Sequence, residues 1–449
     1  MTGLQFRLFL MMVLQIAIWG AWFPQIFGYL PALKFDYVQQ SLILSAFNVG
    51  AILSMFFSTQ FADRYFAAQR FLAFSHLVGG LAMLALAFTR DFWPFMILMY
   101  IHCIFYVPTV SITNSIAFAH MKDAKKEFGI VRMGGTVGWI LVAWPFLFIL
   151  LDWTKVPALD SVWDSAKWVG AALKHPLAGD DYLRGASSIF IVAGVVSLLL
   201  AAYSLTLPHT PPRKGEALAW VEAGRLLAVP FVFVLWIVTF LDAAIHQSFF
   251  SWTFRYLEHV GIPSNWAQPV MSIGQIAEII TMLVLGVVLK NFGYKITMVV
   301  GILGHAARFF VFAFFPEHPW LIITVNILHG ICYAFFFATV YIFVDQVFPK
   351  DARSSAQGLF NLMILGIGPL VANFLCPFLL DKVFTTTASD GRTVTDFKSL
   401  FLVPAGAAVV AIILLAVFFH PPKQLDETTS SGDDEAPKEP DKFQLEGKE

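Results

Sequence analysis

Two polar side chains share one face of an apolar segment in the second half of the chain. Gln275 and Glu278 stand three residues apart in Met-Ser-Ile-Gly-Gln-Ile-Ala-Glu, so a helix places them on the same side. An ionisable group inside a membrane is costly unless it is paired or hydrated, and it therefore marks a functional site by default. Because a buried carboxylate holds a proton more tightly than one in water, we expect Glu278 to bind and release a proton. The alternative is a structural carboxylate that is paired permanently with a cation.

A cation, a hydroxyl and an aromatic ring share a face of another apolar segment. Arg132 opens Val-Arg-Met-Gly-Gly-Thr-Val-Gly-Trp, and Thr136 and Trp139 follow at spacings of four and three residues. The three glycines of this stretch favour close helix approach. This face lines a binding site, or Arg132 lies at the membrane interface and anchors the helix; the sequence leaves both open.

Two further sets have helical spacing. Asp242 and His246 stand four residues apart with Gln247 beside them, and His329 and Tyr333 also stand four apart. Rings combined with amides and hydroxyls suit a flat, polar heterocycle or a sugar, which they can stack on and hydrogen-bond. Because the chain holds 47 phenylalanines, any single ring is more often a packing residue.

Other polar residues have a simpler interpretation. We expect His305 to be a helix-packing or interfacial residue, and Arg308 to lie near the end of a span, where its long side chain reaches the interface or an ion pair. Asp63 and Arg64 lie in Phe-Ala-Asp-Arg-Tyr-Phe, a short polar break between two apolar segments. An acid there caps a helix end and pairs with a base, so we expect these two residues to gate a conformational change.

Composition defines the class of protein that must position these residues. Of 449 residues, 58% are hydrophobic and 13% are charged, whereas soluble domains carry about 25% charged residues. The formal net charge of −1 gives no reason to expect a nucleic-acid partner. The three cysteines stand singly, and no phosphate-binding loop, metal cluster or nucleophile motif is found. We therefore expect neither an enzyme nor a cofactor, and no transport driven by ATP.

The apolar runs predict an all-α polytopic membrane protein with about twelve transmembrane helices in two six-helix halves, because each span needs about 20 mostly apolar residues. The predicted spans are Phe6–Leu33, Ser41–Phe61, Phe71–Thr89, Phe92–Ala119, Val131–Leu151, Ala186–Leu207, Leu227–Phe250, Gln268–Leu289, Ile296–Phe315, Trp320–Val347, Ser354–Leu380 and Leu400–His420.

The polar segments between the spans divide the chain. Residues 1–207 form the first half, with an extramembrane insert at 152–182, and residues 227–420 form the second half. A linker at 208–226 separates them, and the polar tail 421–449 is expected to be disordered. Two halves of six spans are typical of a transporter with pseudo-symmetric repeats.

Lysine and arginine fall mainly in alternate loops, which predicts that both termini are cytoplasmic and that the chain is a multi-pass protein of the inner (cytoplasmic) membrane. The residues on the predicted inside are Arg64, Arg70, Lys122, Lys125, Lys126, Arg213, Lys214, Arg225, Lys290, Lys295, Lys350, Arg353 and Lys423.

The chain resembles the nucleoside:proton symporter family of the major facilitator superfamily, from about residue 10 to residue 420. The segments that carry the resemblance are Leu14–Trp22 with Leu33-Lys34-Phe35, Ala62-Asp63-Arg64, Tyr106–Asn114, Thr206–Pro211 and Arg353–Gly358. The resemblance implies the major facilitator fold and uptake of nucleosides driven by the proton gradient.

The resemblance also implies a binding site. The family's fifth-helix arginine, threonine and aromatic match Arg132, Thr136 and Trp139, and its eighth-helix pair matches Gln275 and Glu278. These residues line the substrate site in the family, and its arginine and glutamate serve proton coupling and switching.

The tenth helix carries both a match and the departures. The family's tenth-helix aromatic matches Tyr333, but Ala334 follows where the family has aspartate, and His329 stands where tyrosine is expected. On the seventh helix His246 or Gln247 stands in for an amide pair.

The expected partners are a small-molecule substrate, protons and the lipid bilayer, and we expect a monomer. A proton-coupled sugar or glycoside symporter of the same superfamily is the alternative. A membrane sensor or embedded enzyme is less favoured, because the extramembrane pieces are too short for a typical soluble domain. The preference between purine and pyrimidine nucleosides stays open.

Overall fold

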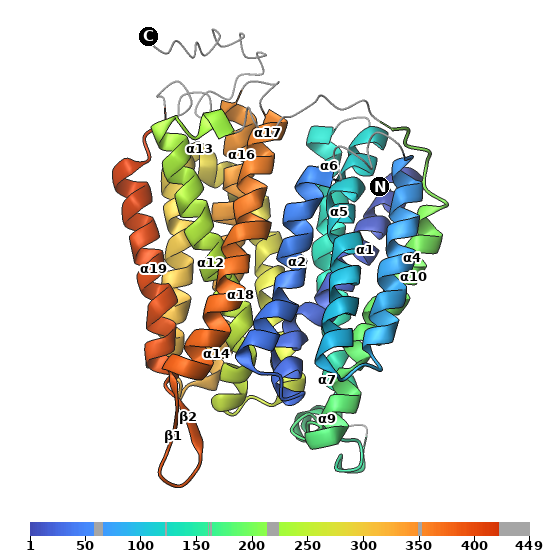
Figure 1. Ribbon diagram of the computed structural model, residues 1–449, viewed down its shortest axis with the longest axis vertical. Coiled ribbons are helices and arrows are strands. Elements are labelled where there is room, and N and C mark those ends of the chain that lie inside the picture. The colour runs from blue at the N-terminus through green and yellow to red at the C-terminus, as the bar shows by residue number, and fades with distance from the viewer. Residues whose placement is uncertain are drawn as a thin grey trace.

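The computed structural model describes residues 1–57, 66–121, 124–159, 161, 164–212, 224–348 and 353–421. Its helices form two bundles side by side, one from each half of the chain (Figure 1). The first bundle contains α1 (Gly3–Ala32), α2 (Tyr37–Phe57), α4 (Ala68–Leu86), α5 (Phe92–His120), α6 (Ala124–Ala143), α7 (Phe146–Ile149), α8 (Ser165–Ala172), α9 (Gly179–Ala186) and α10 (Ser188–Ser204).

The second bundle begins with α12 (Pro230–His259) and ends with α19 (Phe397–Phe418). Between them lie η3 (Ser264–Trp266), α13 (Ala267–Phe314), α14 (Pro319–Thr324), α15 (Ile327–Cys332), η4 (Tyr333–Ala338), α16 (Thr339–Val347), α17 (Arg353–Asn361), η5 (Leu362–Ile367), α18 (Gly368–Phe378), η6 (Leu379–Val383), β1 (Thr385–Thr387) and β2 (Thr393–Thr395).

Ten segments of the described chain are long and apolar enough to cross a membrane, and one of them makes two passes. In α13, Gly293 has a left-handed φ of 69° with ψ of 177°. Gly274 and Gly304 both contact the short helix α15, although an unbroken helix would place them about 45 Å apart. The chain therefore reverses at Gly293, as the predicted break between Leu289 and Ile296 requires. With α2, these passes give the predicted fold of about twelve spans.

The outer surface of the bundles is apolar. Leu283 is 76% exposed and Val287 is 63% exposed, which would be unfavourable over so wide an area in water. In a bilayer the same side chains contact lipid, and the backbone polar groups are satisfied within each helix. This explains why the helices are apolar on nearly every face.

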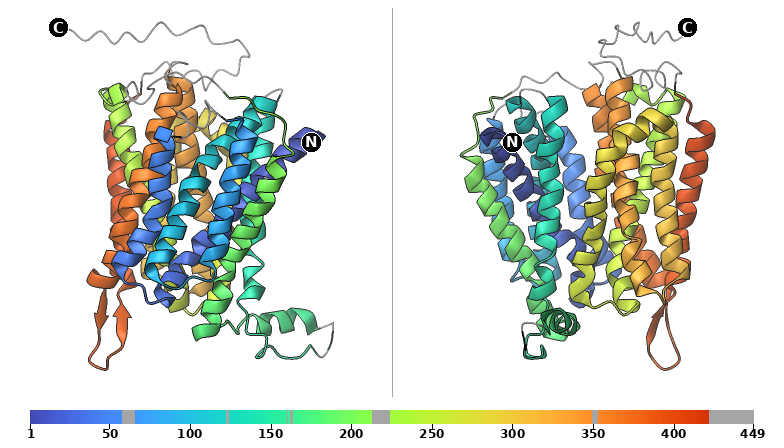
Figure 2. Two further views of the ribbon diagram at one scale, coloured as in Figure 1. Left: turned by 45° about the vertical axis from the view of Figure 1, so that its right-hand side comes forward. Right: turned by 180° about the vertical axis from the view of Figure 1, so that it is seen from behind.

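The region after the fifth span lies at the end of the molecule opposite the N-terminus, together with the hairpin of β1 and β2 (Figures 1 and 2). It contains α8 and α9, and an isolated bridge pairs Leu151 with Pro176. We call this end of the molecule the insert side. The linker residues 213–223 and the tail residues 422–449 lie outside the described residues.

The halves are joined by hydrogen bonds from α13 and its preceding turn. The Gln268 side chain donates to the carbonyl oxygens of Gly20 and Ala21, at 3.3 and 2.9 Å. The Asn265 side chain donates to the carbonyl oxygens of Leu147 and Leu173, each at 3.2 Å. Because the chain passes from α12 to α13 on the insert side, these bonds hold the halves together there.

Candidate functional site

The strongest sequence candidates meet where the two halves face each other. Helix α6 of the first half packs against α13 of the second. Arg132 on α6 lies close enough to Glu278 on α13 and Tyr333 on η4 to interact electrostatically with both. Glu278 is half-buried, and its carboxylate forms no hydrogen bond or ion pair within the described chain. A guanidinium group and a carboxyl group from opposite halves therefore lie within electrostatic range of one another without a direct bond.

Two glycines allow the neighbouring helix α15 to pack directly against α13 at Glu278. A Cβ at Gly330 would lie 2.2 Å from the amide nitrogen of Glu278 and 2.4 Å from the carbonyl oxygen of Gly274. A Cβ at Gly274 would lie 2.7 Å from the Cβ of His329. The backbones of α13 and α15 are thus in contact, which places His329 and Tyr333 beside the Gln275–Glu278 face.

The glycines near Arg132 have the predicted packing role. A Cβ at Gly138 would lie 2.1 Å from the carbonyl oxygen of Val13, so α1 and α6 touch along their backbones. A Cβ at Gly135 would lie 2.6 Å from an Nη atom of Arg132, so the guanidinium folds back over its own helix. The Arg132 side chain is half-buried in this position.

Aromatic side chains from both halves meet around Trp139. The Trp139 ring contacts Trp19 at 5.6 Å and Phe250 at 6.3 Å between ring centroids. Phe23 contacts Trp139 at 6.5 Å and Phe250 at 5.0 Å. We call these four residues, Trp19, Phe23, Trp139 and Phe250, the aromatic cluster. The indole nitrogen of Trp19 is buried and has no hydrogen-bond partner in the part of the chain that the structure describes, so it is a donor that a ligand could satisfy.

The aromatic cluster continues into a pair of imidazoles. His246 and His329 stack with ring centroids 4.6 Å apart and 27° between the planes. Phe250 lies 5.5 Å from His246 and 5.4 Å from His329, and Tyr333 lies 6.3 Å from His246. The Nδ1 atom of His246 is buried and unpartnered. Three predicted residues from α12, α15 and η4 therefore lie together.

The side-chain amides of Gln275 and Gln247 already form hydrogen bonds within the protein. The amide group of Gln275, in the orientation that satisfies it, donates to the carbonyl oxygens of Met271 and Ser272 at 3.1 and 3.2 Å. The amide of Gln247 donates to Asn373 at 2.8 Å. Gln247 is therefore tied to α18 as well as lying beside His246.

Thr136 is half-buried on the same helix as Arg132, and no hydrogen bond to its hydroxyl occurs among the described residues. Asp63 and Arg64, the predicted gating pair, lie outside the described residues. Their predicted role is therefore untested.

The prediction for Arg308 was wrong, whereas His305 is a buried packing residue, one of the two alternatives expected for it. Arg308 is fully buried, donates to the Nδ1 atoms of His329 and His305 at 2.9 and 3.0 Å, and lies 4.0 Å from the centroid of the Phe249 ring. His305 places its Nε2 atom 3.7 Å from Asp242. An arginine can be buried here because two imidazoles accept its protons. The i, i+3 spacing of His305 and Arg308 was the signal that could have indicated this.

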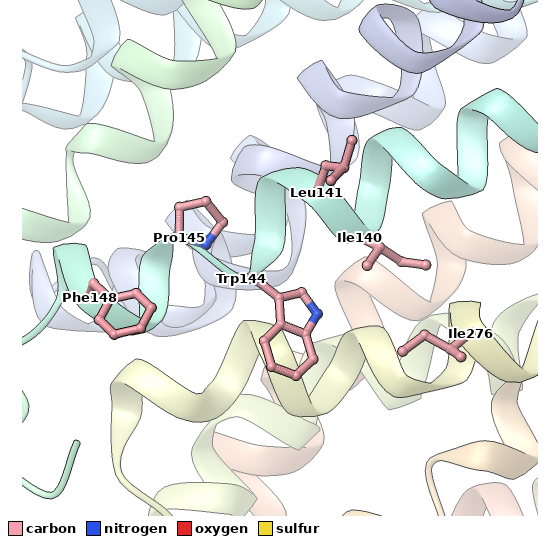
Figure 3. Close-up of a pocket in the computed structure, with 6 residues that line it drawn as sticks. All are labelled: Ile140, Leu141, Trp144, Pro145, Phe148 and Ile276. Atoms are coloured by element: carbon pink, nitrogen blue, oxygen red, sulfur yellow. The ribbon is translucent and has the colours of Figure 1, made fainter. Parts of the chain in front are cut away.

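A separate apolar groove opens between α6, α7 and α13 (Figure 3). Its volume is about 570 Å³, and its lining is Ile140, Leu141, Trp144, Pro145, Phe148 and Ile276. Trp144 is 42% exposed, and the lining side chains are apolar. The groove thus lacks the charges and hydrogen-bonding groups that a polar ligand needs, and the site lies deeper between the halves.

Two six-helix bundles that place ionisable and aromatic side chains between them define a secondary transporter of the major facilitator type. The comparisons with known proteins agree. The profile of the family described as "Nucleoside H+ symporter" matches residues 2–160 and 162–424. The chain belongs to this nucleoside–proton symporter family, and its function is proton-coupled nucleoside transport across the membrane.

Individual relatives cover most of the chain. The "Putative nucleoside transporter YegT" of Escherichia coli (strain K12) is 30% identical over 391 residues, 84% of this chain and 85% of that protein. The crystal structure of the nucleoside transporter NupG is similar with a TM-score of 0.75 at 22% identity, covering 94% of this chain and 100% of that one. A D-xylose-proton symporter structure gives a TM-score of 0.68 at 13% identity, covering 93% and 98%. The two structures show the shared fold.

Proposed function

We propose that this protein imports nucleosides by proton symport and that Glu278 carries the proton. The observation that supports this most is the placement of Arg132 and Glu278, on opposite halves and within electrostatic range but without a direct bond. A proton on Glu278 cancels the attraction between these charges. Because the two residues belong to different halves, that change alters how strongly the halves hold together at the site.

The surrounding side chains fit a nucleoside. In this proposal the flat base stacks on Trp139 or Tyr333, and the substrate forms hydrogen bonds with Gln275, Thr136 and His246. His329 and Gln247 complete the lining on the side of the second half. The His246–His329 stack occupies the region where the family resemblance led us to expect an amide pair and a tyrosine. We therefore assign base selection to these two imidazoles.

Uptake into proteoliposomes tests the proposal directly. Radiolabelled uridine and adenosine are added with and without an inward proton gradient, to wild-type protein and to Glu278→Gln. We expect the gradient to drive accumulation in the wild type and to drive much less accumulation in Glu278→Gln, while nucleoside exchange without a gradient continues. Full gradient-driven accumulation by Glu278→Gln would show that the Glu278 carboxylate does not carry the proton. Competition by ribose or disaccharides, but not by uridine or adenosine, would favour the sugar alternative.

The orientation and the oligomeric state belong to the same proposal. Both termini face the cytoplasm of the inner membrane, so the insert side faces outward, and one chain forms the whole transport path. Labelling of a cysteine placed at Thr154 by a membrane-impermeant reagent in intact cells tests the orientation. Labelling only after the membrane is broken would reverse it.

A further inference from the structure

A second buried carboxylate lies in the interior of the second half. Asp242 on α12 is fully buried, and neither of its oxygens accepts a hydrogen bond from any described residue. Its nearest charged or titratable contact is His305, whose Nε2 atom lies 3.7 Å from Oδ1. His305 and His329 both accept from the fully buried Arg308. We call these four residues, Asp242, His305, Arg308 and His329, the Asp242 cluster.

The bonds of Arg308 fix the protons on both imidazoles. Arginine is always a donor, so the Nδ1 atoms of His305 and His329 must be acceptors. In each ring the single proton then sits on Nε2, and a second proton cannot be added without breaking the bond to Arg308. Arg308 itself is held against the Phe249 ring at 4.0 Å and the Phe309 ring at 5.1 Å.

Asp242 is the group of this cluster that can accept a proton without breaking a hydrogen bond. Buried polar atoms in proteins are nearly always hydrogen-bonded, and a buried carboxylate with no donor on either oxygen is costly. The Nε2–H of His305 points at it from beyond the usual hydrogen-bond distance of about 3 Å. A proton on one carboxylate oxygen would remove the unpaired charge, and the cluster would change from neutral, with Asp242 and Arg308 opposed, to singly positive.

We propose that Asp242 is a second proton-binding site of this transporter, built from the Asp242 cluster and separate from Glu278. This inference rests on the proposed function and deepens it. The step is a transfer of one proton from water to a carboxylate oxygen of Asp242 and back, and no other bond forms or breaks.

The geometry connects this carboxylate to the substrate site. Asp242 and His246 lie one helical turn apart on α12, and His246 stacks on His329, which Arg308 holds. While Asp242 is ionised, its attraction to Arg308 draws α12 toward the second pass of α13. When Asp242 is protonated that attraction ends, so α12 is free to shift and to move His246 against His329.

Few other titratable side chains lie close enough to the Asp242 cluster to bind the same proton. The titratable side chains that face the cluster are His246 on α12, Cys332 on α15 and Tyr333 on η4. Helices α18 and α19 also pack on α12, and their titratable residues lie elsewhere. Cys376 contacts Ser248, and Lys398 lies over the Phe314 ring.

Infrared difference spectroscopy tests the proton site without any substrate. Membranes containing the wild-type protein are titrated with pH, and the carboxylic-acid stretch is recorded with and without 13C-labelled aspartate. Among the described residues Asp242 is the only aspartate in the buried interior. We expect a pH-dependent band that shifts with the aspartate label and is lost in Asp242→Asn. A band that is insensitive to the aspartate label, or one that persists in Asp242→Asn, would overturn the inference.

A transport measurement gives the second readout. The number of protons transported with each nucleoside is measured in proteoliposomes from the membrane voltage at which the net flux reverses. We expect this number to fall by one in Asp242→Asn. An unchanged ratio would overturn the inference.

Thr239→Val is the matched control for this measurement, because the Thr239 hydroxyl lies on the same helix as Asp242 and donates to Leu235 of that helix. The ratio should stay at the wild-type value in this variant. His305→Gln, whose amide offers an acceptor to Arg308 and a donor toward Asp242 but cannot titrate, separates the two groups of the cluster. A ratio reduced by one in His305→Gln, with that of Asp242→Asn unchanged, would assign the proton to the imidazole instead.

The two readouts separate the two proposals. Absence of nucleoside transport by the wild type would overturn the proposed function, and the infrared band would still decide the protonation of Asp242. Nucleoside symport with no aspartate band would leave the proposed function intact and overturn this inference alone. The wild-type isotope experiment needs no variant, so a failure of Asp242→Asn to fold does not affect it.

Discussion

Gly330 lies against the backbone of Glu278 so closely that a Cβ at residue 330 would come within 2.2 Å of the Glu278 amide nitrogen. The neighbouring atoms belong to the backbone of α13 and have no side-chain freedom with which to move aside. The position of the Glu278 carboxylate, our proposed proton carrier, relative to His329 and Tyr333 therefore depends on the absence of one methyl group.

The first prediction concerns this contact. Gly330→Ala must separate α15 from α13, which we expect to cost about 1–3 kcal/mol of stability, as overpacking does in other proteins. The melting temperature of the purified protein should fall, and uptake should be lost. Gly286→Ala is the control, because no described atom outside the adjacent backbone of its own helix lies within 4 Å of a Cβ at that position. A Gly330→Ala protein with wild-type melting temperature and uptake would show that the two helices are not packed in this way.

The second prediction concerns stacking in the aromatic cluster. Trp139→Ala removes the ring that touches Trp19, Phe23 and Phe250. Stacking of a base on an aromatic side chain contributes about 1–3 kcal/mol, so the dissociation constant for nucleoside should rise by about tenfold or more. Trp144→Ala removes a ring that is 42% exposed and should leave binding unchanged. Equal effects of the two substitutions would argue against stacking at Trp139.

The third prediction concerns the pH dependence of uptake. In the insert, hydrogen bonds from Lys155 and then Thr154 lower the pKa of Asp152 to about 2. The stability that a lowered carboxylate pKa contributes is present above the unfolded pKa of about 3.9 and is lost as pH falls through the folded value. The charge of Asp152 is therefore constant across the range in which uptake is measured.

Asp152→Asn should leave the pH profile of uptake between about pH 5 and pH 8 unchanged, because its titration lies below that range. Glu278→Gln, measured in parallel, should flatten the profile. A shifted profile in Asp152→Asn alone would place the pH sensor in the insert.

The fourth prediction concerns the amide chain that joins the halves. Asn373 on α18 accepts from Gln247 at 2.8 Å and donates to Asn48 on α2 at 2.7 Å. Removing one partner of a buried hydrogen bond costs about 1–3 kcal/mol, so Asn373→Ala should lower the melting temperature and favour opening on the insert side. Electron–electron distance measurements between spin labels on the insert and on the β1–β2 hairpin should lengthen.

Thr239→Val provides the comparison for Asn373→Ala, because the Thr239 hydroxyl donates only to Leu235 of its own helix. It should leave those distances unchanged. The Asn48→Ala and Asn373→Ala substitutions together should cost less than the sum of the two, since they share one hydrogen bond. Strict additivity would mean that the contact does not hold the halves together.

The sequence by itself determined the architecture. Runs of apolar residues fixed about twelve spans, because a bilayer leaves helices as the way to satisfy the backbone, and length and hydropathy are local properties. The break before Ile296 was predicted from its polar residues, and Gly293 reverses the chain there. The faces of Arg132 and Glu278 also followed from helical spacing alone.

Only the tertiary structure decided which faces meet. Nothing in the local sequence distinguishes Phe250 from the other phenylalanines, and it is a site neighbour because α12 presents it to Trp139 and His329. Arg308 was expected near a span end, but it lies buried because two histidines from separate helices accept its protons. The Phe250–Trp139 and Arg308–His329 contacts join different helices, and the packing of whole helices sets them. Periodicity gives each helix its faces but does not specify the partner of each face.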